Sequence, residues 1–311
     1  MGLPGFDELR RRADGLASPV PLAVAGGADR AVLEAMRSAV DRGWVAPILV
    51  GGEAEIRRIA DRAGVDLDGL AILDVQGGES QALAAVAEVR QGRAKLLAKG
   101  LIATPDLMAA VMGPEFGLRA HRVVCQVVLM EVLPPSRRFL LADTGVIVKP
   151  KLATKVDIIR HAIEVARAMG EAHPRVALMA ATESPGPSMP ETLDAVEIQA
   201  RNASGEFPGA HVQGPLSFDL AYSAEAGGRK RVEGEVVGRA DAMVFPDLLS
   251  ANLTVKAIMY TAPCQFGGVL RGTTAPVAFM SRADTAETRL NSLALALAIL
   301  GGKGEAPDAA R

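Results

Sequence analysis

Short apolar segments alternate with helical patterns through the first hundred residues, and this alternation restricts the fold more than any other feature of the sequence. The run PLAVAGG (21–27) is a strand ending in glycines, and a helical pattern with Val32, Met36 and Val40 on one stripe follows it. The segment WVAPILVGG (44–52) and the helix after it repeat the arrangement. This strand–helix order predicts a mainly parallel sheet covered by helices on both faces.

A change of texture near residue 120 predicts a second α/β unit. Two longer β-rich segments, HRVVCQVVLMEVL and RRFLLADTGVIV, are joined by the turn LPPSR, which indicates an antiparallel pair. A long helix at 152–170 and more strand–helix alternation follow. The last strand, PVAFM, and the helix at 285–300 resemble the first unit, so we expect the chain to return to it. The predicted fold is two α/β domains, 1–120 plus 275–311 and 121–274.

Composition excludes several classes of function. The net charge of −2 provides no overall basic field for nucleic acid or an acidic membrane surface. The two cysteines lie far apart and the four histidines have no ligand spacing, so we predict no metal site. The N-terminal segment has no apolar signal-peptide core, and the apolar run at 292–300 is too short to span a bilayer. These features predict a cytoplasmic protein.

The junction PVAFMSRADTAETRL (276–290) is the strongest candidate site. A buried strand stops at Ser281-Arg282, and the spacing of Asp284 and Glu287 predicts a capping box with Asp284 as N-cap of the next helix. Free N–H groups and the helix dipole favour an anion at such a turn. The guanidinium of Arg282 suits phosphate, and Ser281 adds a hydrogen bond.

Other strand–helix junctions supply further candidates for binding residues. A lysine inside an apolar strand costs free energy unless it has a partner, which makes Lys99 a candidate. Asn252 and Lys256 stand one helical turn apart, so both side chains can face one site. Glycines let the backbone approach a ligand closely, and we expect a sharp turn at Gly214-Pro215. The predicted substrate-binding residues are Lys99, Thr104 (as the N-cap before Pro105), Gly214, Asn252, Lys256, Gly267 and Gly268. No P-loop, complete dinucleotide fingerprint or nucleophile elbow is present in the sequence.

These junctions together resemble the phosphate acetyltransferase and phosphate butyryltransferase family. The segments that carry the resemblance run in order from about 95 to 300: LLAKGLIAT, GLR, LLADTGVIVKP, VQGPLSFDLAYS, RADAMVFPDLLSANLTVK and GGVLRGTTAPVAFMSRADTAETRL. The stretches Lys99-Gly100-Leu101 and Ser281–Asp284 are closer to the butyryltransferase branch. The resemblance implies two α/β domains like those of isocitrate and isopropylmalate dehydrogenases, an active site in the interdomain cleft, and a homodimer.

The resemblance also implies a reaction, acyl-CoA plus phosphate to acyl phosphate plus CoA, by direct transfer. Coenzyme A is then a substrate, with no permanently bound cofactor, and the family's phosphate-site pair falls on Ser281 and Arg282. Acetyltransferases of the family carry an aspartate seven positions after the serine, where this chain has Thr288. Asp284 is therefore either only a helix cap or the catalytic base for the CoA thiol.

Two alternatives remain at this point. One is an NAD-dependent decarboxylating dehydrogenase of the related fold, which needs a metal-binding aspartate cluster, whereas Asp219, Asp241 and Asp247 are scattered in the sequence. The other is a non-catalytic domain that binds coenzyme A or has a regulatory role.

Overall fold

The structure, a computed structural model, describes residues 2–120, 123–134, 136–279, 281 and 284–302. It divides into two compact units, which are described separately below. The first unit comprises Phe6–Val124 and Phe266–Gly301, and the second is formed by Cys125–Gln265 with residues 2–5 and 302.

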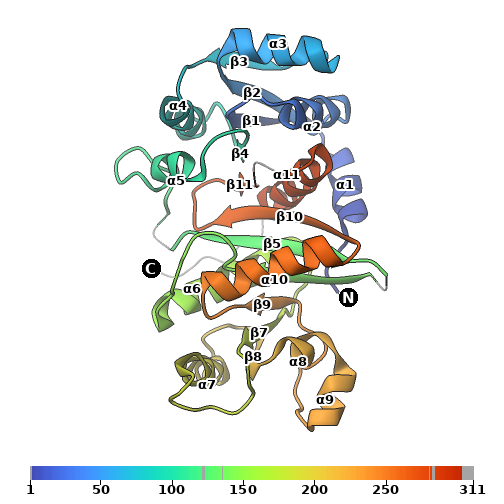
Figure 1. Ribbon diagram of the computed structural model, residues 1–311, viewed down its shortest axis with the longest axis vertical. Helices are drawn as coiled ribbons and strands as arrows, with labels where there is room; N and C mark the ends of the chain where they lie inside the picture. Colours follow the sequence, from blue (N-terminus) through green and yellow to red (C-terminus); the bar gives the residue numbers. More distant parts are fainter. Residues whose placement is uncertain (1, 121–122, 135, 280, 282–283, 303–311) are drawn as a thin grey trace. The chain divides into compact units, whose positions relative to one another are not determined.

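The first unit is a mainly parallel sheet between two layers of helices (Figure 1). Its strands are β1 (Val20–Ala25), β2 (Val45–Gly51), β3 (Ala71–Asp74), β4 (Leu96–Lys99), β10 (Cys264–Arg271) and β11 (Val277–Ala278). Its helices are α1 (Phe6–Asp14), α2 (Arg30–Asp41), α3 (Glu53–Ala63), α4 (Gly78–Arg90), α5 (Thr104–Met112) and α11 (Ala286–Gly301).

The strand order in this unit is β3-β2-β1-β4-β11-β10, and every neighbouring pair is parallel except β10 with β11. Helices α4 and α5 pack together on one face of the sheet, and α1, α2 and α11 pack together on the other (Figure 1). The predicted parallel sheet is thus confirmed. The last strand, β11, joins it beside β4, far from it in sequence.

Local sequence explains how α2 forms and packs. Asp29 caps the helix by accepting a hydrogen bond from the N–H of Val32 at 3.0 Å. Val32 and Met36 are buried, as the predicted stripe requires, and Ala39 is buried where Val40 is only half-buried. The buried face of α2 is therefore rotated slightly from the predicted one, and its helical spacing is kept.

The second unit has the strand order β5-β6-β9-β7-β8. Its strands are β5 (Cys125–Val132), β6 (Arg137–Ala142), β7 (Arg175–Met179), β8 (His211–Leu216) and β9 (Ala242–Val244). Its helices are α6 (Leu152–Ala168), α7 (Pro190–Ala203), α8 (Phe218–Tyr222), α9 (Ala224–Lys230) and α10 (Leu248–Thr261). The predicted antiparallel pair is confirmed as β5 and β6, and the other neighbours are parallel.

One local prediction in the second unit is wrong. Gly214 and Pro215 do not form a sharp turn but lie within β8, where the pairing with β7 shifts register. A Cβ at Gly214 would lie 2.5 Å from the Cβ of Leu178, so only glycine fits at this close approach of the two strands. A bulge thus accommodates residues that otherwise interrupt a strand.

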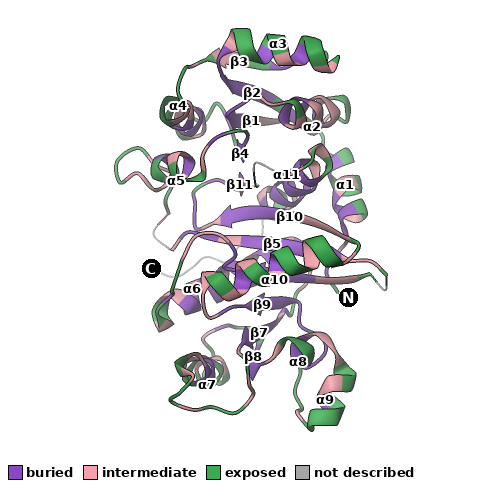
Figure 2. Cartoon of the chain, in the orientation of Figure 1, coloured by how far each residue is buried: buried purple, intermediate pink, exposed green. Residues whose placement is uncertain are grey.

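Burial follows the expected pattern within each unit (Figure 2): the strands are mostly buried, and the helices expose their outer faces. Along the part of the chain that the structure describes, every helix is too short or too polar to cross a lipid bilayer.

Candidate functional site

Three neighbouring parallel strands of the first unit end at one edge of its sheet. Strand β4 pairs with β1 on one side and with β11 on the other, both in parallel. The carboxyl ends of parallel strands are where open α/β sheets bind ligands. The segments at this edge are the turn leading to Asp29, the turn after Lys99, and the turn that begins with Ser281.

Glycines allow two of these turns to pack against each other. Gly26 has a φ of +80°, and a Cβ on Gly100 would meet the carbonyl oxygen of Gly26. Backbone hydrogen bonds join the turns: Gly100 N–H donates to Ala25, and Leu101 N–H donates to Gly26, each at 2.8 Å. The end of β4, which carries Lys99, is therefore held firmly against the end of β1.

The turn before α11 is closed by its own residues. The N–H of Ser281 donates to Oδ2 of Asp284 at 2.7 Å, and the N–H of Asp284 donates to the carbonyl of Ser281 at 3.3 Å. Ser281 is exposed and Asp284 is half-buried. The predicted catalytic residue Arg282 lies outside the described residues.

The predicted capping box of α11 is wrong by one residue. Helix α11 begins at Ala286, and Oγ1 of Thr285 accepts a hydrogen bond from the N–H of Thr288 at 3.3 Å, as an N-cap does. Glu287 instead forms a 3.1 Å ion pair with Arg10. The physical reason is competition, because the Asp284 carboxylate is bound to the N–H of Ser281, which leaves the capping position to the next hydroxyl.

A buried arginine at this edge was missed from the sequence. Arg289, in the first turns of α11, is 5% exposed, and its Nη1 donates to the carbonyl of Lys99 at 3.0 Å. Its Nη2 lies 4.0 Å from Oδ1 of Asp29. Burial lowers the pKa of the Arg289 guanidinium, and the carboxylates of Asp29 and Asp284 act in the opposite direction. A sequence signal was present, since Arg289 stands four residues before Leu293 on the apolar face of this helix.

Lys99 lies where the sequence placed it, but Thr104 does not have the predicted capping role. Lys99 is the last residue of β4 and is 2% exposed. Helix α5 starts at Thr104, and Ala103 is its N-cap, with an extended backbone and a carbonyl that accepts from Leu107 at 3.2 Å. No side chain makes a capping bond there, and the Thr104 side chain faces solvent.

Two of the glycines predicted to bind a substrate, Gly267 and Gly268, contact α11. A Cβ on Gly267 would lie 2.8 Å from the backbone nitrogen of Ser292 and 2.9 Å from the carbonyl carbon of Asn291. The N–H of Gly268 donates to Oγ of Ser292 at 2.9 Å. Gly267 lets the helix approach β10 closely, which is a structural requirement in its own right.

The remaining predicted residues lie in the second unit. Asn252 Nδ2 donates to the carbonyl of Thr144 at 3.2 Å, so its amide fixes the loop after β6. Lys256 is exposed one turn further along α10. In the same loop, burial raises the pKa of Asp143, although four backbone N–H groups bound to its carboxylate act in the opposite direction.

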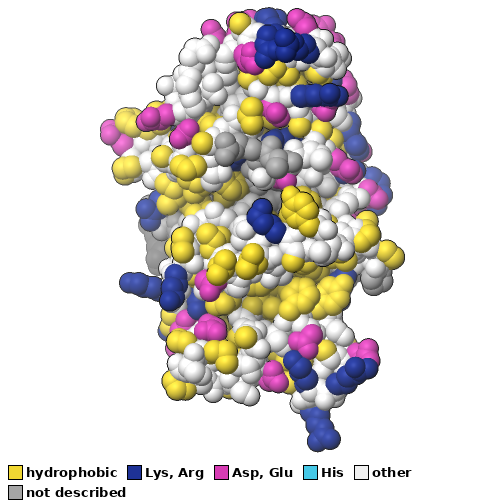
Figure 3. Space-filling model, viewed as in Figure 1, with side chains coloured by type: hydrophobic (Ala, Val, Ile, Leu, Met, Phe, Trp, Pro, Cys, Tyr) yellow, Lys and Arg dark blue, Asp and Glu magenta, His cyan; other side chains and the backbone are white. Residues whose placement is uncertain are grey.

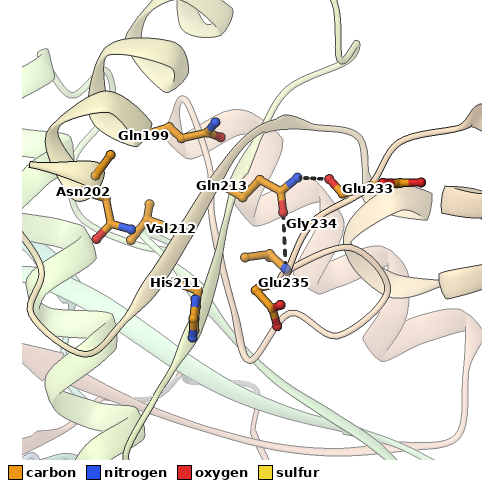
Figure 4. Close-up of a pocket in the computed structure, with 10 residues that line it drawn as sticks. Gln199, Asn202, His211, Val212, Gln213, Glu233, Gly234 and Glu235 are labelled. Atoms are coloured by element: carbon orange, nitrogen blue, oxygen red, sulfur yellow. Dashed lines mark hydrogen bonds between the residues drawn. The ribbon is translucent and has the colours of Figure 1, made fainter.

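A cavity of about 330 Å³ also lies in the second unit, between α7, β8 and the segment 233–236 (Figure 4). The side chain of Gln213 crosses it, donating to the carbonyl of Glu233 at 2.8 Å and accepting from the N–H of Val236 at 3.2 Å. None of the residues predicted from the sequence lines this cavity.

Comparison with known proteins favours an acyltransferase over the two alternatives. Residues 79–297 match the family model described as phosphate acetyl/butaryl transferase. The chain belongs to this family. It is 39% identical to the phosphate butyryltransferase of Clostridium acetobutylicum, with 91% of this chain and 94% of that protein covered. It is 35% identical to the phosphate acetyltransferase of Thermotoga maritima, with 88% and 93% covered.

A solved structure agrees with this assignment. The fold is similar to that of a branched-chain phosphotransacylase from Enterococcus faecalis V583, with a TM-score of 0.80, 29% identity, and 90% of this chain and 99% of that chain covered. Membership of the family makes this chain an acyltransferase.

Proposed function

We propose that this enzyme transfers an acyl group between coenzyme A and inorganic phosphate, with an acetyl or butyryl class of acyl group. The observation that carries the proposal is the closed turn of Ser281 and Asp284 in front of α11, at the carboxyl edge of parallel strands, in a chain of this family. The free N–H groups and dipole of a helix that begins there favour a phosphate group.

Direct transfer fits these residues. The CoA thiolate attacks the carbonyl carbon of the acyl phosphate, the new C–S bond forms, and the bond to the phosphate oxygen breaks as phosphate leaves with the electron pair. Such a step needs positioning and positive charge where negative charge grows. Arg282 and the N-terminus of α11 supply that charge, and the Ser281 hydroxyl donates a hydrogen bond to a phosphate or carbonyl oxygen.

Asp284 is the proposed base for the CoA thiol. Thr288, at the place of the acetyltransferase aspartate, is 8% exposed, and its hydroxyl lies 3.1 Å from that of Thr285. A threonine does not take a proton from a thiol at neutral pH, whereas a carboxylate does. Thr285 caps α11, and the Asp284 carboxylate stands on the turn that begins with Ser281.

The decisive assay follows phosphate-dependent release of CoA with Ellman's reagent, using acetyl-, propionyl- and butyryl-CoA. We expect release to require phosphate, and the three rates to define the acyl preference. A complete lack of release with all three would refute the proposed reaction, and a saturable thermal shift with NAD would instead favour the dehydrogenase.

The role of Arg282 is tested by comparing Arg282→Lys with Arg282→Ala. Lysine keeps the charge but not the planar fork that binds two phosphate oxygens. We expect both variants to lose turnover by on the order of 100-fold or more. Turnover of the lysine variant close to that of the wild type would contradict the assignment.

Other features that the sequence patterns or the resemblance imply stay predictions. They are the binding of substrate by Lys99, Thr104, Gly214, Asn252, Lys256, Gly267 and Gly268, the domain boundaries at 120 and 275, the dehydrogenase-like arrangement with an interdomain active site, and the cytoplasmic location. Coenzyme A enters as a substrate, and we propose no permanently bound cofactor.

We infer that the subunits form a homodimer through the second unit. Helix α10 exposes Leu249, Leu253 and Tyr260, which are 69%, 58% and 81% exposed, and Figure 3 shows hydrophobic side chains on this face. Such a stripe is typical of an interface rather than of a solvated helix. Light scattering of wild type and Leu253→Glu tests this: we expect a dimer that the glutamate weakens, and a monomeric wild type would refute it.

A further inference from the structure

Arg289 is a buried cation that the surrounding protein compensates only in part. Among the described residues, its Nε and Nη2 have no hydrogen-bond partner, and the one hydrogen bond of its guanidinium runs from Nη1 to the carbonyl of Lys99. The carboxylate of Asp29, at 4.0 Å from Nη2, is beyond hydrogen-bonding distance. Oδ1 of Asp29 already accepts the capping hydrogen bond from Val32.

The environment of this guanidinium makes its missing hydrogen bonds costly in free energy. Arg289 lines a small cavity of about 20 Å³, and the other lining residues are apolar except for Lys99, a second buried cation. Arginine keeps its proton at any ordinary pH, so it cannot escape the cost by becoming neutral. A buried charge is tolerated when it is paired and hydrogen-bonded. An anion bound to the Nε/Nη2 edge would supply both the negative charge and the hydrogen-bond acceptors that these two nitrogens lack.

The position of Arg289 indicates which anion this is. It stands four residues after the helix cap Thr285, and its charge interacts with that of Asp284, the residue that closes the turn at Ser281. The Nε and Nη2 groups of a guanidinium form one side of its fork and match two oxygens of a phosphate group. Both unused donors therefore belong to the edge suited to a phosphate group.

We propose that Arg289 binds the phosphate substrate through its Nε/Nη2 edge, as a further residue of the phosphate site proposed at Ser281. This inference rests on the proposed function, because it names a further residue of the same phosphate site. Arg289 then has two tasks: it holds the end of β4 through the carbonyl of Lys99, and it directs its other two nitrogens to phosphate oxygens.

The experiment measures binding of inorganic phosphate to the full-length protein by calorimetry and by thermal shift. We expect Arg289→Met to raise the Kd for phosphate by about 10- to 100-fold, as for the loss of charge-assisted hydrogen bonds. Arg289→Lys should fall between this variant and the wild type, because it keeps the charge without the fork. The thermal melt in phosphate-free buffer reports on the structural task separately, because Arg289→Met also removes the hydrogen bond to the carbonyl of Lys99.

A matched control is Arg10→Met. Arg10 also bonds to α11, through Oδ1 of Asn291 at 2.6 Å and Glu287 at 3.1 Å. Its substitution should leave the Kd for phosphate unchanged. Kinetics give a second readout, since Arg289→Met should raise the KM for phosphate while the KM for acyl-CoA stays constant.

Several outcomes would overturn the proposal. They are an unchanged Kd for phosphate in Arg289→Met and an equal loss of affinity in Arg10→Met. If the methionine variant does not fold, an unchanged Kd for phosphate in Arg289→Lys overturns the proposal in its place. A parallel titration with CoA separates the sources of phosphate, and a change in CoA affinity alone would mean that the edge binds a phosphate of CoA. If the wild type binds phosphate through Arg289 but releases no CoA, the proposed reaction is wrong and the anion site stands.

Discussion

Replacing Thr285 with valine removes the cap of α11 while keeping the shape of the side chain. The valine cannot accept the 3.3 Å hydrogen bond from the N–H of Thr288, and it cannot pair with the Thr288 hydroxyl at 3.1 Å. Loss of an N-cap costs about 1 kcal/mol, within a range of roughly 0.5–2. For a unit of about 150 residues this corresponds to a fall in Tm of roughly 2–4 °C.

The assay is a thermal melt followed by circular dichroism, with Thr285→Ser as the control because it keeps the accepting oxygen. Glu287→Gln is a second control, since Glu287 pairs with Arg10 on the surface and does not cap the helix. An exposed ion pair contributes little, so this variant should melt within about 1 °C of the wild type. If Thr285→Val melts like the wild type while Glu287→Gln loses stability, the cap lies at Asp284 after all.

Two further predictions separate packing from chemistry. Gly267→Ala should lower stability by about 1–3 kcal/mol, because the added Cβ meets the backbone of α11. A raised KM beside this loss would show that Gly267 also contacts a substrate. Gly228→Ala, in a helix with open space around it, should be neutral or slightly stabilising, and an unstable Gly228→Ala with a stable Gly267→Ala would contradict the packing account. Asp284→Asn should fold normally, because its amide oxygen still accepts from Ser281, but lose roughly 10²–10⁴-fold in turnover and recover as the pH rises from 6.5 to 9. A pH-independent loss would exclude Asp284 as the base.

The fold was largely readable from the sequence because its elements are set by local patterns. The glycine-ended strands β1 and β2, the antiparallel pair β5 and β6, and the long helix α6 all follow from periodicity and turn residues. The error at Gly214 has a tertiary cause: the strand continues because β7 lies close enough to pair with it across a bulge. No local pattern contains that information.

For the candidate site, the sequence predicted where the turn lies but not which residues cap the helix or are buried beside it. The junction at Ser281 could be found because a strand, a hydroxyl and a helix start meet there. The cap could not be assigned by spacing alone, since Asp284 and Thr285 are both good N-cap residues and the choice depends on which one Ser281 binds. Arg289 was missed although it stands on the apolar face of α11, because its burial depends on β1, β4, β11 and α2, which lie around it in the folded chain.

The shifted cap bears on the proposal that Asp284 takes the role of an aspartate at 288. In this helix Thr288 occupies the third position after the cap, and its N–H and hydroxyl are engaged with Thr285. The carboxylate stands instead at Asp284, on the turn that begins with Ser281. If only the position of the carboxylate differs from that of the acetyltransferases, adding Thr288→Asp to Asp284→Asn should restore part of the lost turnover. The first turn of a helix accepts an acidic side chain well, so the double variant should fold. If Asp284 has only a structural role, adding Thr288→Asp should not raise the turnover of the Asp284→Asn variant. A recovery of turnover in the double variant would therefore support a catalytic role for the carboxylate.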